Sequence, residues 1–199
     1  MTTTSARSGL TGRVVGPGDP DYALASAGWN LLFAHSPAVV VFAQQTQDVV
    51  NALAWARQNG ITPRVRSGRH CLEGWSNVDG GIVIDVSEMK YVTIDMASHT
   101  ATVGAGLNQL EAVAELGKSA VAAPTGTEGS VGLVGATLGG GFGFLTRNFG
   151  MASDNLLSAE IVVASDTDGA TASTAVATAH VTASRRGVWK NTTKAVSTA

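Results

Sequence analysis

Two arginines, a serine hydroxyl and a histidine lie within five consecutive residues, Arg66-Ser67-Gly68-Arg69-His70. Arg66 is the last residue of an expected strand, 61–66, and the other four residues follow it. The backbone is therefore expected to turn directly after the strand. A turn of this kind exposes successive amide N–H groups, and arginine adds positive charge and paired donors, which together suit a phosphate group. The pattern alone also fits a polar surface turn with solvated arginines, which is the more common case.

A second unusual segment runs from Gly132 to Gly143, where four of the last five residues are glycine. Because glycine has no side chain, a flat ligand or a diphosphate can lie directly against such a backbone. The segment is not a P-loop, since no Gly-Lys-Ser/Thr follows, and its spacing and strand context differ from the Rossmann fingerprint. A flexible linker is the alternative, but the interleaved apolar residues Leu133, Val134, Leu138 and Phe142 argue against it.

Other residues with reactive side chains lack such surroundings. A single cysteine, Cys71, excludes an internal disulfide framework and a cysteine-based zinc site. The remaining histidines, three tryptophans and three aspartates are expected to be structural, as packing, turn or strand-end residues: His35, His99, His180, Trp29, Trp55, Trp75, Asp85, Asp95 and Asp154.

The elements around these segments predict an α+β fold with two small sheets packed around shared helices. We expect strands at 38–42, 61–66, 81–86, 91–95, 100–103 and 156–164, the last of them central and fully buried. Helices are expected at 48–58, with Thr46 as N-cap, and at 107–116, with Asn108 near its start. Residues 1–37 are expected to be a loop-rich leader, 38–165 the folded domain, and 166–199 an Ala/Thr/Ser-rich tail that is poorly ordered or forms an alanine-rich helix.

The composition is that of an ordinary soluble globular protein, with 44% hydrophobic and 14% charged residues among 199. A formal net charge of -2 argues against general nucleic-acid binding. No apolar run is long enough to span a membrane, and the polar N-terminus has no signal-peptide core. A cytoplasmic location is therefore expected.

The sequence resembles one family in several segments, which occur in this order: RSGRH with GW and DGGIVIDVS downstream, then APTGT, then VGATLGGGFGFLTRNFGMASDNLLSAEIV. It is the FAD-binding domain of the vanillyl-alcohol oxidase (PCMH-type) superfamily, nearest to bacterial oxidases related to 6-hydroxy-D-nicotine oxidase and the berberine bridge enzymes. The similarity covers about residues 38–165, and both motifs occur in the family's order and separation. It implies a PCMH-type FAD-binding domain with two small α/β subdomains, without the substrate domain.

The resemblance implies a role for each matching residue. The family's motif histidine bonds to the 8α-methyl carbon of the flavin, and His70 occupies its place. The second anchor of some members, a cysteine before the glycine run, is absent, with Glu128 and Gly129 in that neighbourhood, so one covalent link is expected. The family commonly has glycine where Arg69 stands. The other residues implied to contact FAD are Arg66, Ser67, Gly68 and Arg69 at the diphosphate, Gly135 and Gly139 to Gly141 along the cofactor, Asn155 at the buried end, Ile161 and Val162 beside the adenine, and Cys71, Gly126 and Gly132.

The implied reaction is that of an oxidase: hydride passes from a C–OH or C–N bond of a small substrate to FAD, and O₂ reoxidises the flavin. Relatives are more than twice this length, and the catalytic base lies in a part with no counterpart here, so no catalytic residue is assigned. The alternative is a non-catalytic flavin-binding fragment that self-associates or needs a completing partner chain. Neither nucleic acid nor a membrane is an expected partner, and the substrate itself is not identified.

Overall fold

The computed structural model describes residues 7–163 and 174–183 of the chain. Its contacts divide it into two compact units, residues 1–88 with 162–175, and residues 89–161 with 176–199. Each unit is built around a four-stranded sheet. The expected α+β arrangement with two small sheets is therefore confirmed.

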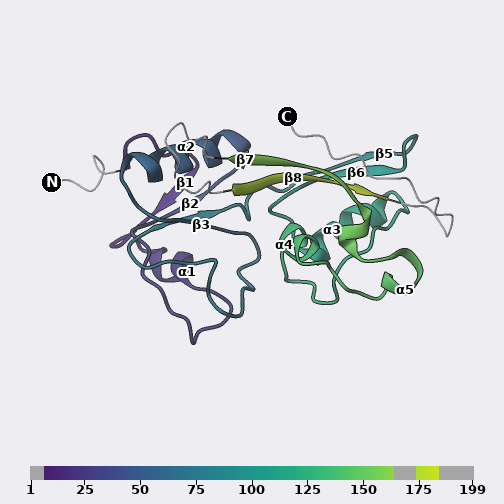
Figure 1. Cartoon of the computed structure of the whole chain (residues 1–199), viewed down its shortest axis with the longest axis horizontal. Coiled ribbons are helices and arrows are strands. Elements are labelled where there is room, and N and C mark those ends of the chain that lie inside the picture. Colours follow the sequence, from purple (N-terminus) through teal and green to yellow (C-terminus); the bar gives the residue numbers. More distant parts are fainter. Residues whose placement is uncertain (1–6, 164–173, 184–199) are drawn as a thin grey trace. The chain divides into compact units, whose positions relative to one another are not determined.

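The sheet of the first unit has the order β1-β2-β4-β3 (Figure 1). Strands β2 (Val39–Phe42), β4 (Ile82–Asp85) and β3 (Pro63–Arg66) run parallel, and β1 (Arg13–Val15) joins the edge antiparallel to β2. The parallel strands were predicted. β1 lies in the leader, which was expected to be loop-rich. This strand was not predicted, because three residues are too few to show a periodic pattern.

Helices lie on both sides of this sheet, with α1 (Tyr22–Ser26) on one side and α2 (Thr46–Gln58) on the other (Figure 1). Side chains alternate between the faces of a strand, so Val40, Phe42 and Val83 form a cluster with Ala25 of α1. α2 packs against β4 with its own apolar side.

The start of α2 differs from the expectation in one detail. The N-cap is Gln45 and no side chain caps the helix, so the prediction of Thr46 as N-cap is wrong. Instead, the buried carboxylate of Asp48 accepts hydrogen bonds from the Gln44 amide at 3.0 Å and the Thr11 hydroxyl at 2.6 Å. Burial raises the pKa of Asp48, but these hydrogen bonds outweigh it and hold the pKa below its ordinary value.

The three parallel strands end in one row. In the register of the sheet, Asp85 of β4 lies opposite both Phe42 of β2 and Arg66 of β3. Ligands of open α/β sheets bind beyond the carboxyl ends of parallel strands. The loop that carries His70 follows β3 at this end of the sheet.

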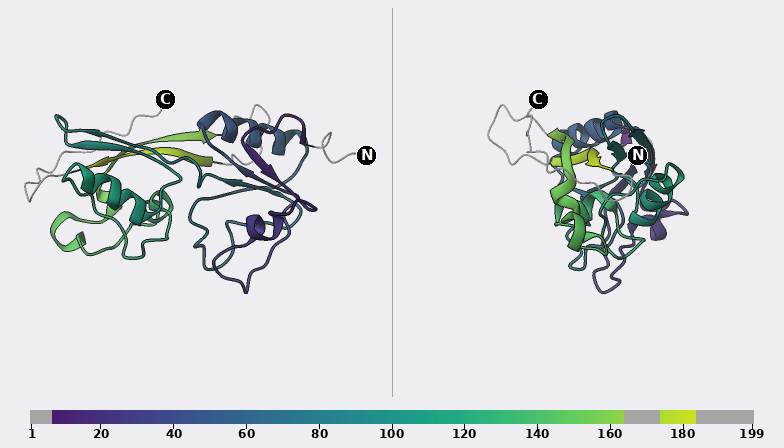
Figure 2. Two further views of the ribbon diagram at one scale, coloured as in Figure 1. Left: turned by 180° about the vertical axis from the view of Figure 1, so that it is seen from behind. Right: turned by 90° about the vertical axis from the view of Figure 1, so that its right-hand side faces the viewer.

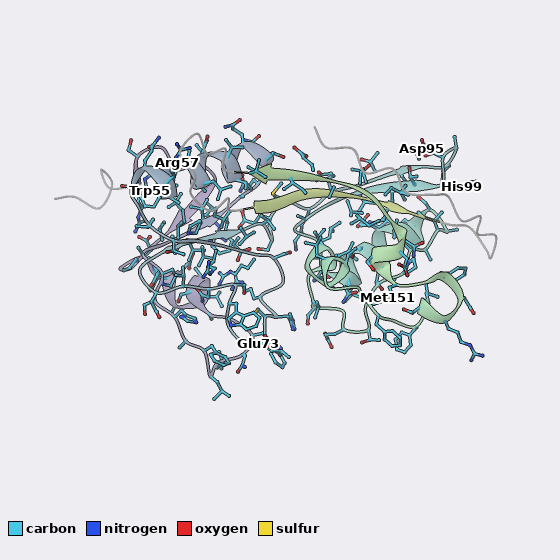
Figure 3. All side chains as sticks on the ribbon, in the orientation of Figure 1. Trp55, Arg57, Glu73, Asp95, His99 and Met151 are labelled. Atoms are coloured by element: carbon cyan, nitrogen blue, oxygen red, sulfur yellow. The ribbon has the colours of Figure 1, made fainter. Side chains whose placement is uncertain are left out.

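The sheet of the second unit has the order β5-β6-β8-β7 (Figure 2). β5 (Val92–Asp95), β6 (Thr100–Gly104) and β8 (Thr174–Thr182) are antiparallel neighbours, and β7 (Leu156–Val163) follows at the edge. The turn between β5 and β6 carries Asp95 and His99, which Figure 3 labels.

Helix α3 (Gln109–Lys118) packs on this second sheet, with Leu116 buried against Ala101 and Val181. It begins with a capping box in which the Asn108 side chain accepts from the Glu111 amide at 2.8 Å and the Glu111 carboxylate accepts from the Asn108 amide at 3.0 Å. The prediction of Asn108 near the helix start is confirmed.

Two expectations fail in this sheet. β7 is not central and fully buried: it lies at the edge, Ile161 and Val163 are more than half exposed, and Val162 is its one buried side chain. The run of apolar residues was misleading because β-branched residues favour strands at edges as well as in cores. Within the tail, 174–182 forms β8, since backbone pairing with β6 does not need large side chains. The other tail residues, 166–173 and 184–199, lie outside the described residues.

Between α3 and β7 the chain forms three short helices: α4 (Leu133–Leu138), α5 (Thr146–Phe149) and the 3₁₀ turn η2 (Ala152–Asn155). α4 and η2 contact each other. Among the described residues, none of the helices has the length and apolar character required to cross a membrane.

Candidate functional site

The side chain of Arg66, the last residue of β3, points into the first unit and is almost completely buried. Its Nε donates to Oδ2 of Asp85 at 2.8 Å, and the two side chains are 1% and 0% exposed. Burial lowers the pKa of Arg66, while the Asp85 carboxylate opposes that shift. Two charges this deep are tolerated because they are paired and hydrogen-bonded.

The same arginine also binds the end of α1. Arg66 donates to the carbonyl oxygens of Ala25 and, at 3.4 Å, of Ala27, and Arg69 donates to that of Leu24 at 2.9 Å. The last carbonyls of a helix have no partner within it and carry partial negative charge, so cationic donors suit them. The donors of the Arg66 side chain are thus bound by other groups of the protein. The prediction that Arg66 contacts a diphosphate therefore applies to its backbone amide.

Arg69 differs from Arg66 in being partly accessible. Its side chain is 26% exposed, its Nε lies 3.4 Å from Oδ2 of Asp85, and its guanidinium lies over the Phe42 ring at 5.6 Å. Its φ of 63° falls in the left-handed region that favours glycine. Glycine, the residue that the resemblance implies at this position, would adopt this conformation without strain. With Arg66 and Asp85 it forms a group of two positive charges and one negative, a net charge of +1.

His70 follows directly, with its imidazole stacked on the indole of Trp29. The ring centroids lie 5.3 Å apart and the planes meet at 26°. Two hydrogen bonds flank this stack: the Trp29 amide donates to the Arg69 carbonyl at 3.0 Å, and Nδ2 of Asn30 donates to the Leu72 carbonyl at 2.7 Å.

Beyond His70, the loop continues through Cys71, a free and partly buried thiol whose Sγ lies 4.0 Å from the Glu73 carboxylate. Glu73 is labelled on this loop in Figure 3. Further along, Nδ2 of Asn77 donates to the Ser26 carbonyl at 2.7 Å, a fourth bond to the end of α1. Ser67 and Gly68 lie between the buried Arg66 and the left-handed Arg69.

In the second unit, protein contacts explain three of the six glycines in the segment 132–143, and they also explain Gly126 before it. A Cβ at Gly143 would overlap the Thr125 carbonyl oxygen, and one at Gly126 would overlap the Gln109 amide. Gly140 and Gly141 have positive φ, 113° and 71°, and a Cβ on either would also overlap a neighbouring side chain. The neighbour of Gly140 is Met151, labelled in Figure 3. These glycines are required by the fold.

Gly135 and Gly139 are different. A Cβ at Gly135, inside α4, would meet no described atom within 4 Å, and one at Gly139 would make only ordinary contacts. Gly132 is the N-cap of α4. Glycine inside a helix costs stability relative to alanine, so a glycine with free space around it needs another reason, and close approach of a ligand is one.

The three remaining predicted residues lie at the end of this region. Asn155 is buried, and its Nδ2 donates to the carbonyls of Phe149 and Met151, both at 2.9 Å, so its amide holds η2 to the end of α5. Ile161 is exposed and Val162 buried on the edge strand β7. Their predicted roles toward FAD remain predictions.

The second unit also contains a mainly apolar cavity of about 400 Å³. It lies between the C-terminal half of α3, the segment 121–126 and the residues before α5. Its lining is Val113, Leu116, Gly117, Val121, Ala122, Ala123, Thr125, Gly126, Phe144 and Leu145. No cluster of three metal-ligating side chains occurs in the described parts of the chain.

Each unit, taken by itself, has one feature that suits part of a dinucleotide. The loop after β3 combines a net positive charge with a backbone turn at the carboxyl ends of parallel strands, which suits a diphosphate. The free space at Gly135 leaves room for a ligand against the α4 backbone. The sequence analysis did not predict that Trp29 and Asp85 contact the motif residues. One signal could have indicated Asp85: a second arginine, Arg69, stands where glycine was expected, and a cation there needs a carboxylate partner.

Residues 37–168 match the FAD binding domain family, and the chain belongs to it. The match gives the class of protein: an FAD-linked oxidoreductase domain of the PCMH type, related to 6-hydroxynicotine oxidase and berberine-bridge-enzyme-like proteins. The expected family is therefore confirmed.

Particular relatives sharpen this placement. The chain is 44% identical over 161 residues to the FAD-linked oxidoreductase YgaK of Bacillus subtilis, covering 81% of this chain and 36% of that protein. It is 36% identical over 155 residues to (R)-6-hydroxynicotine oxidase of Paenarthrobacter nicotinovorans, covering 78% and 34%. The chain thus spans about a third of the length of the curated relatives it matches.

Solved structures agree. The crystal structure of 6-hydroxy-D-nicotine oxidase from Arthrobacter nicotinovorans superposes with a TM-score of 0.78 at 28% identity, over 88% of this chain and 43% of that one. Glucooligosaccharide oxidase from Acremonium strictum, described with a 6-S-cysteinyl, 8α-N1-histidyl FAD, has a TM-score of 0.76 at 21% identity, over 87% and 40%, and shares the fold.

Proposed function

We propose that this chain binds FAD through one covalent bond at His70 and belongs to an oxidase that oxidises a C–OH or C–N bond of a small substrate. The bound flavin supplies the hydride acceptor and passes the electrons on to O₂. The observation that supports the covalent link is the position of His70 in the turn after β3, directly after Arg69 of the arginine–aspartate group. The resemblance of the RSGRH segment to the family's motif implies the linking role of this histidine.

The chain's own residues have defined tasks in this proposal. The backbone of residues 66–69 and the Arg69 guanidinium face the diphosphate, and Asp85 holds both arginines in place. The backbone at Gly135 and Gly139 lies along the cofactor. Cys71 stays a thiol, because it neighbours His70 in sequence and does not occupy the place of the second anchor.

Forming the link replaces one hydrogen of the imidazole and one of the flavin methyl group by a C–N bond. The two hydrogens leave with two electrons, and O₂ takes them up as H₂O₂. The electron balance of the step is thus closed by FAD and O₂.

Acid precipitation tests the link. Purified protein should keep its yellow colour in the pellet, and mass spectrometry of the digest should find FAD on the peptide containing His70. His70→Ala should abolish attachment, whereas the matched control His99→Asn, in the β5–β6 turn of the other unit, should retain it. Flavin that washes entirely into the supernatant would overturn the covalent assignment.

The alternative proposal is a flavin-binding chain that turns over only with a completing partner or a second copy of itself. The observation that favours it is the exposed edge strand β7, whose Ile161 and Val163 are more than half exposed. H₂O₂ release with alcohols, amines or sugars from a monomer in light scattering would exclude it. Absence of turnover together with an acid-stable flavin would support it. A cytoplasmic location also stays a proposal.

A further inference from the structure

We infer that Trp29 is a positioning residue for His70: its indole fixes the plane of the imidazole in which the bond to the flavin forms. This inference rests on the covalent link proposed above. It starts from the stack of the two rings, 5.3 Å between centroids and 26° between planes. Offset stacking of flat rings stabilises one orientation of both partners.

The backbone of Trp29 is held in place independently of its side chain. Its amide donates to the Arg69 carbonyl at 3.0 Å, on one side of His70, and Nδ2 of Asn30 donates to the Leu72 carbonyl at 2.7 Å, on the other. The segment that carries the indole is therefore tied to the histidine loop at two points. These bonds keep the backbone of Trp29 beside the histidine loop, within reach of the imidazole.

The segment before Trp29 is fixed by the same charged group that shapes the histidine loop. Arg66 binds the carbonyls of Ala25 and Ala27, Arg69 binds that of Leu24, and Asp85 holds both arginines. The charged group thus connects the end of α1, three residues before Trp29, to the turn that presents His70. One network therefore holds the backbone before Trp29 and the backbone before His70.

Exposure distinguishes Trp29 from a core packing residue. The residue is 59% exposed, so it contributes little to the buried core, and its loss should leave the fold intact. An imidazole that forms a bond must hold one nitrogen toward the reacting carbon, and a flat neighbour on one face achieves this without a hydrogen bond that would compete for that nitrogen.

The experiment compares Trp29→Ala, Trp29→Phe and Trp75→Ala. Trp75 is the matched control, an indole 73% exposed on the same loop as His70, for which no stacking on His70 is found among the described residues. Flavin-free protein from a riboflavin-limited host is mixed with FAD in air, and acid-precipitable flavin is followed over time. We expect Trp29→Ala to slow attachment roughly tenfold or more, with Trp29→Phe close to the unsubstituted protein and Trp75→Ala unchanged.

Two further readouts separate positioning from folding. Reversible FAD binding, measured in the His70→Ala background, should be the same with and without the Trp29→Ala substitution, within about twofold. The ring protons of His70 should show an upfield NMR shift from the indole that disappears in Trp29→Ala and stays in Trp75→Ala. These measurements do not depend on turnover.

The outcomes are distinct. Equal attachment rates for Trp29→Ala and the unsubstituted protein would overturn the positioning role and leave the covalent link standing. Slower attachment that Trp29→Phe does not rescue, accompanied by weakened reversible binding, would also overturn it, since the residue would then be structural. No acid-stable flavin in the unsubstituted protein would overturn the covalent function and this inference together.

Discussion

The two segments that resemble the family most strongly, residues 66–70 and 132–143, are built on opposite principles. The first is shaped by side chains: a buried ion pair, a second arginine in the left-handed region and a ring stack. The second is shaped by the absence of side chains, because Gly140, Gly141 and Gly143 have no room for a Cβ. A motif that looks like ligand chemistry can therefore be largely a folding requirement, and substitutions separate the two.

The largest effect is expected at the ion pair of the first segment. Asp85→Ala leaves the buried Arg66 without its partner, and removal of one member of a buried pair typically costs about 3–5 kcal/mol. Urea unfolding of flavin-free protein measures this. The control is Asp79→Ala, which removes a 70% exposed carboxylate paired with His35 and should change the midpoint much less. Equal losses would mean that the pair is not buried in solution.

A large effect is also expected at Gly143 in the second segment. Gly143→Ala places a Cβ against the Thr125 carbonyl oxygen. This is a backbone atom, so it can move only if the neighbouring residues of the chain move with it. Overpacking of this kind costs about 1–3 kcal/mol or more. Thermal unfolding without flavin should show the loss, and an unchanged midpoint would show that the segment is looser than the structure indicates.

Much of the fold follows from the sequence because the strands of both sheets carry clear apolar patterns. β2 and β4 were predicted within one or two residues, since both are buried on both faces. β8 and β1 were missed, because one has few large side chains and the other only three residues. Local sequence does not encode pairing with a distant strand.

The candidate site shows the same limit. The motif located His70 and Arg69, but it assigned Trp29 to packing and Asp85 to a strand end. Asp85 does end β4, but that assignment omits its ion pairs with the two arginines. Trp29 is 59% exposed and stacks on His70, so it is not a residue of the buried core. The partners of Asp85 and of Trp29 are 19 and 41 positions away in sequence (85 − 66 and 70 − 29), and only folding brings them together.

A smaller effect is expected for a substitution at Gly135, which should raise the free energy of unfolding and weaken FAD binding. Gly135→Ala adds a methyl group to free space inside α4, so stability should rise by about 0.5–1 kcal/mol. If the cofactor lies along this backbone, reversible FAD binding in the His70→Ala background should weaken roughly tenfold, or about 1.4 kcal/mol. Calorimetry and unfolding on the same samples measure both. Unchanged binding would assign Gly135 to the fold as well.

The smallest change in stability is expected for Arg69→Gly, which restores the family's usual residue. The left-handed conformation of Arg69 costs about 1–2 kcal/mol, and glycine removes that cost. The partly exposed ion pair with Asp85 is lost in exchange, a contribution of about 0–1 kcal/mol, together with the bond to the Leu24 carbonyl. The terms nearly cancel, so the unfolding midpoint should move little.

Binding should respond to Arg69→Gly where stability does not. The charged group falls from +1 to zero, so reversible FAD binding should weaken and lose part of its dependence on salt. Arg69→Lys is the matched control: it keeps the charge and the left-handed strain, so it should be the less stable of the two variants and the tighter binder. If Arg69→Gly instead unfolds as readily as Asp85→Ala, the Arg69 guanidinium is a structural part of the buried network. The proposed diphosphate contact would then depend on backbone amides alone.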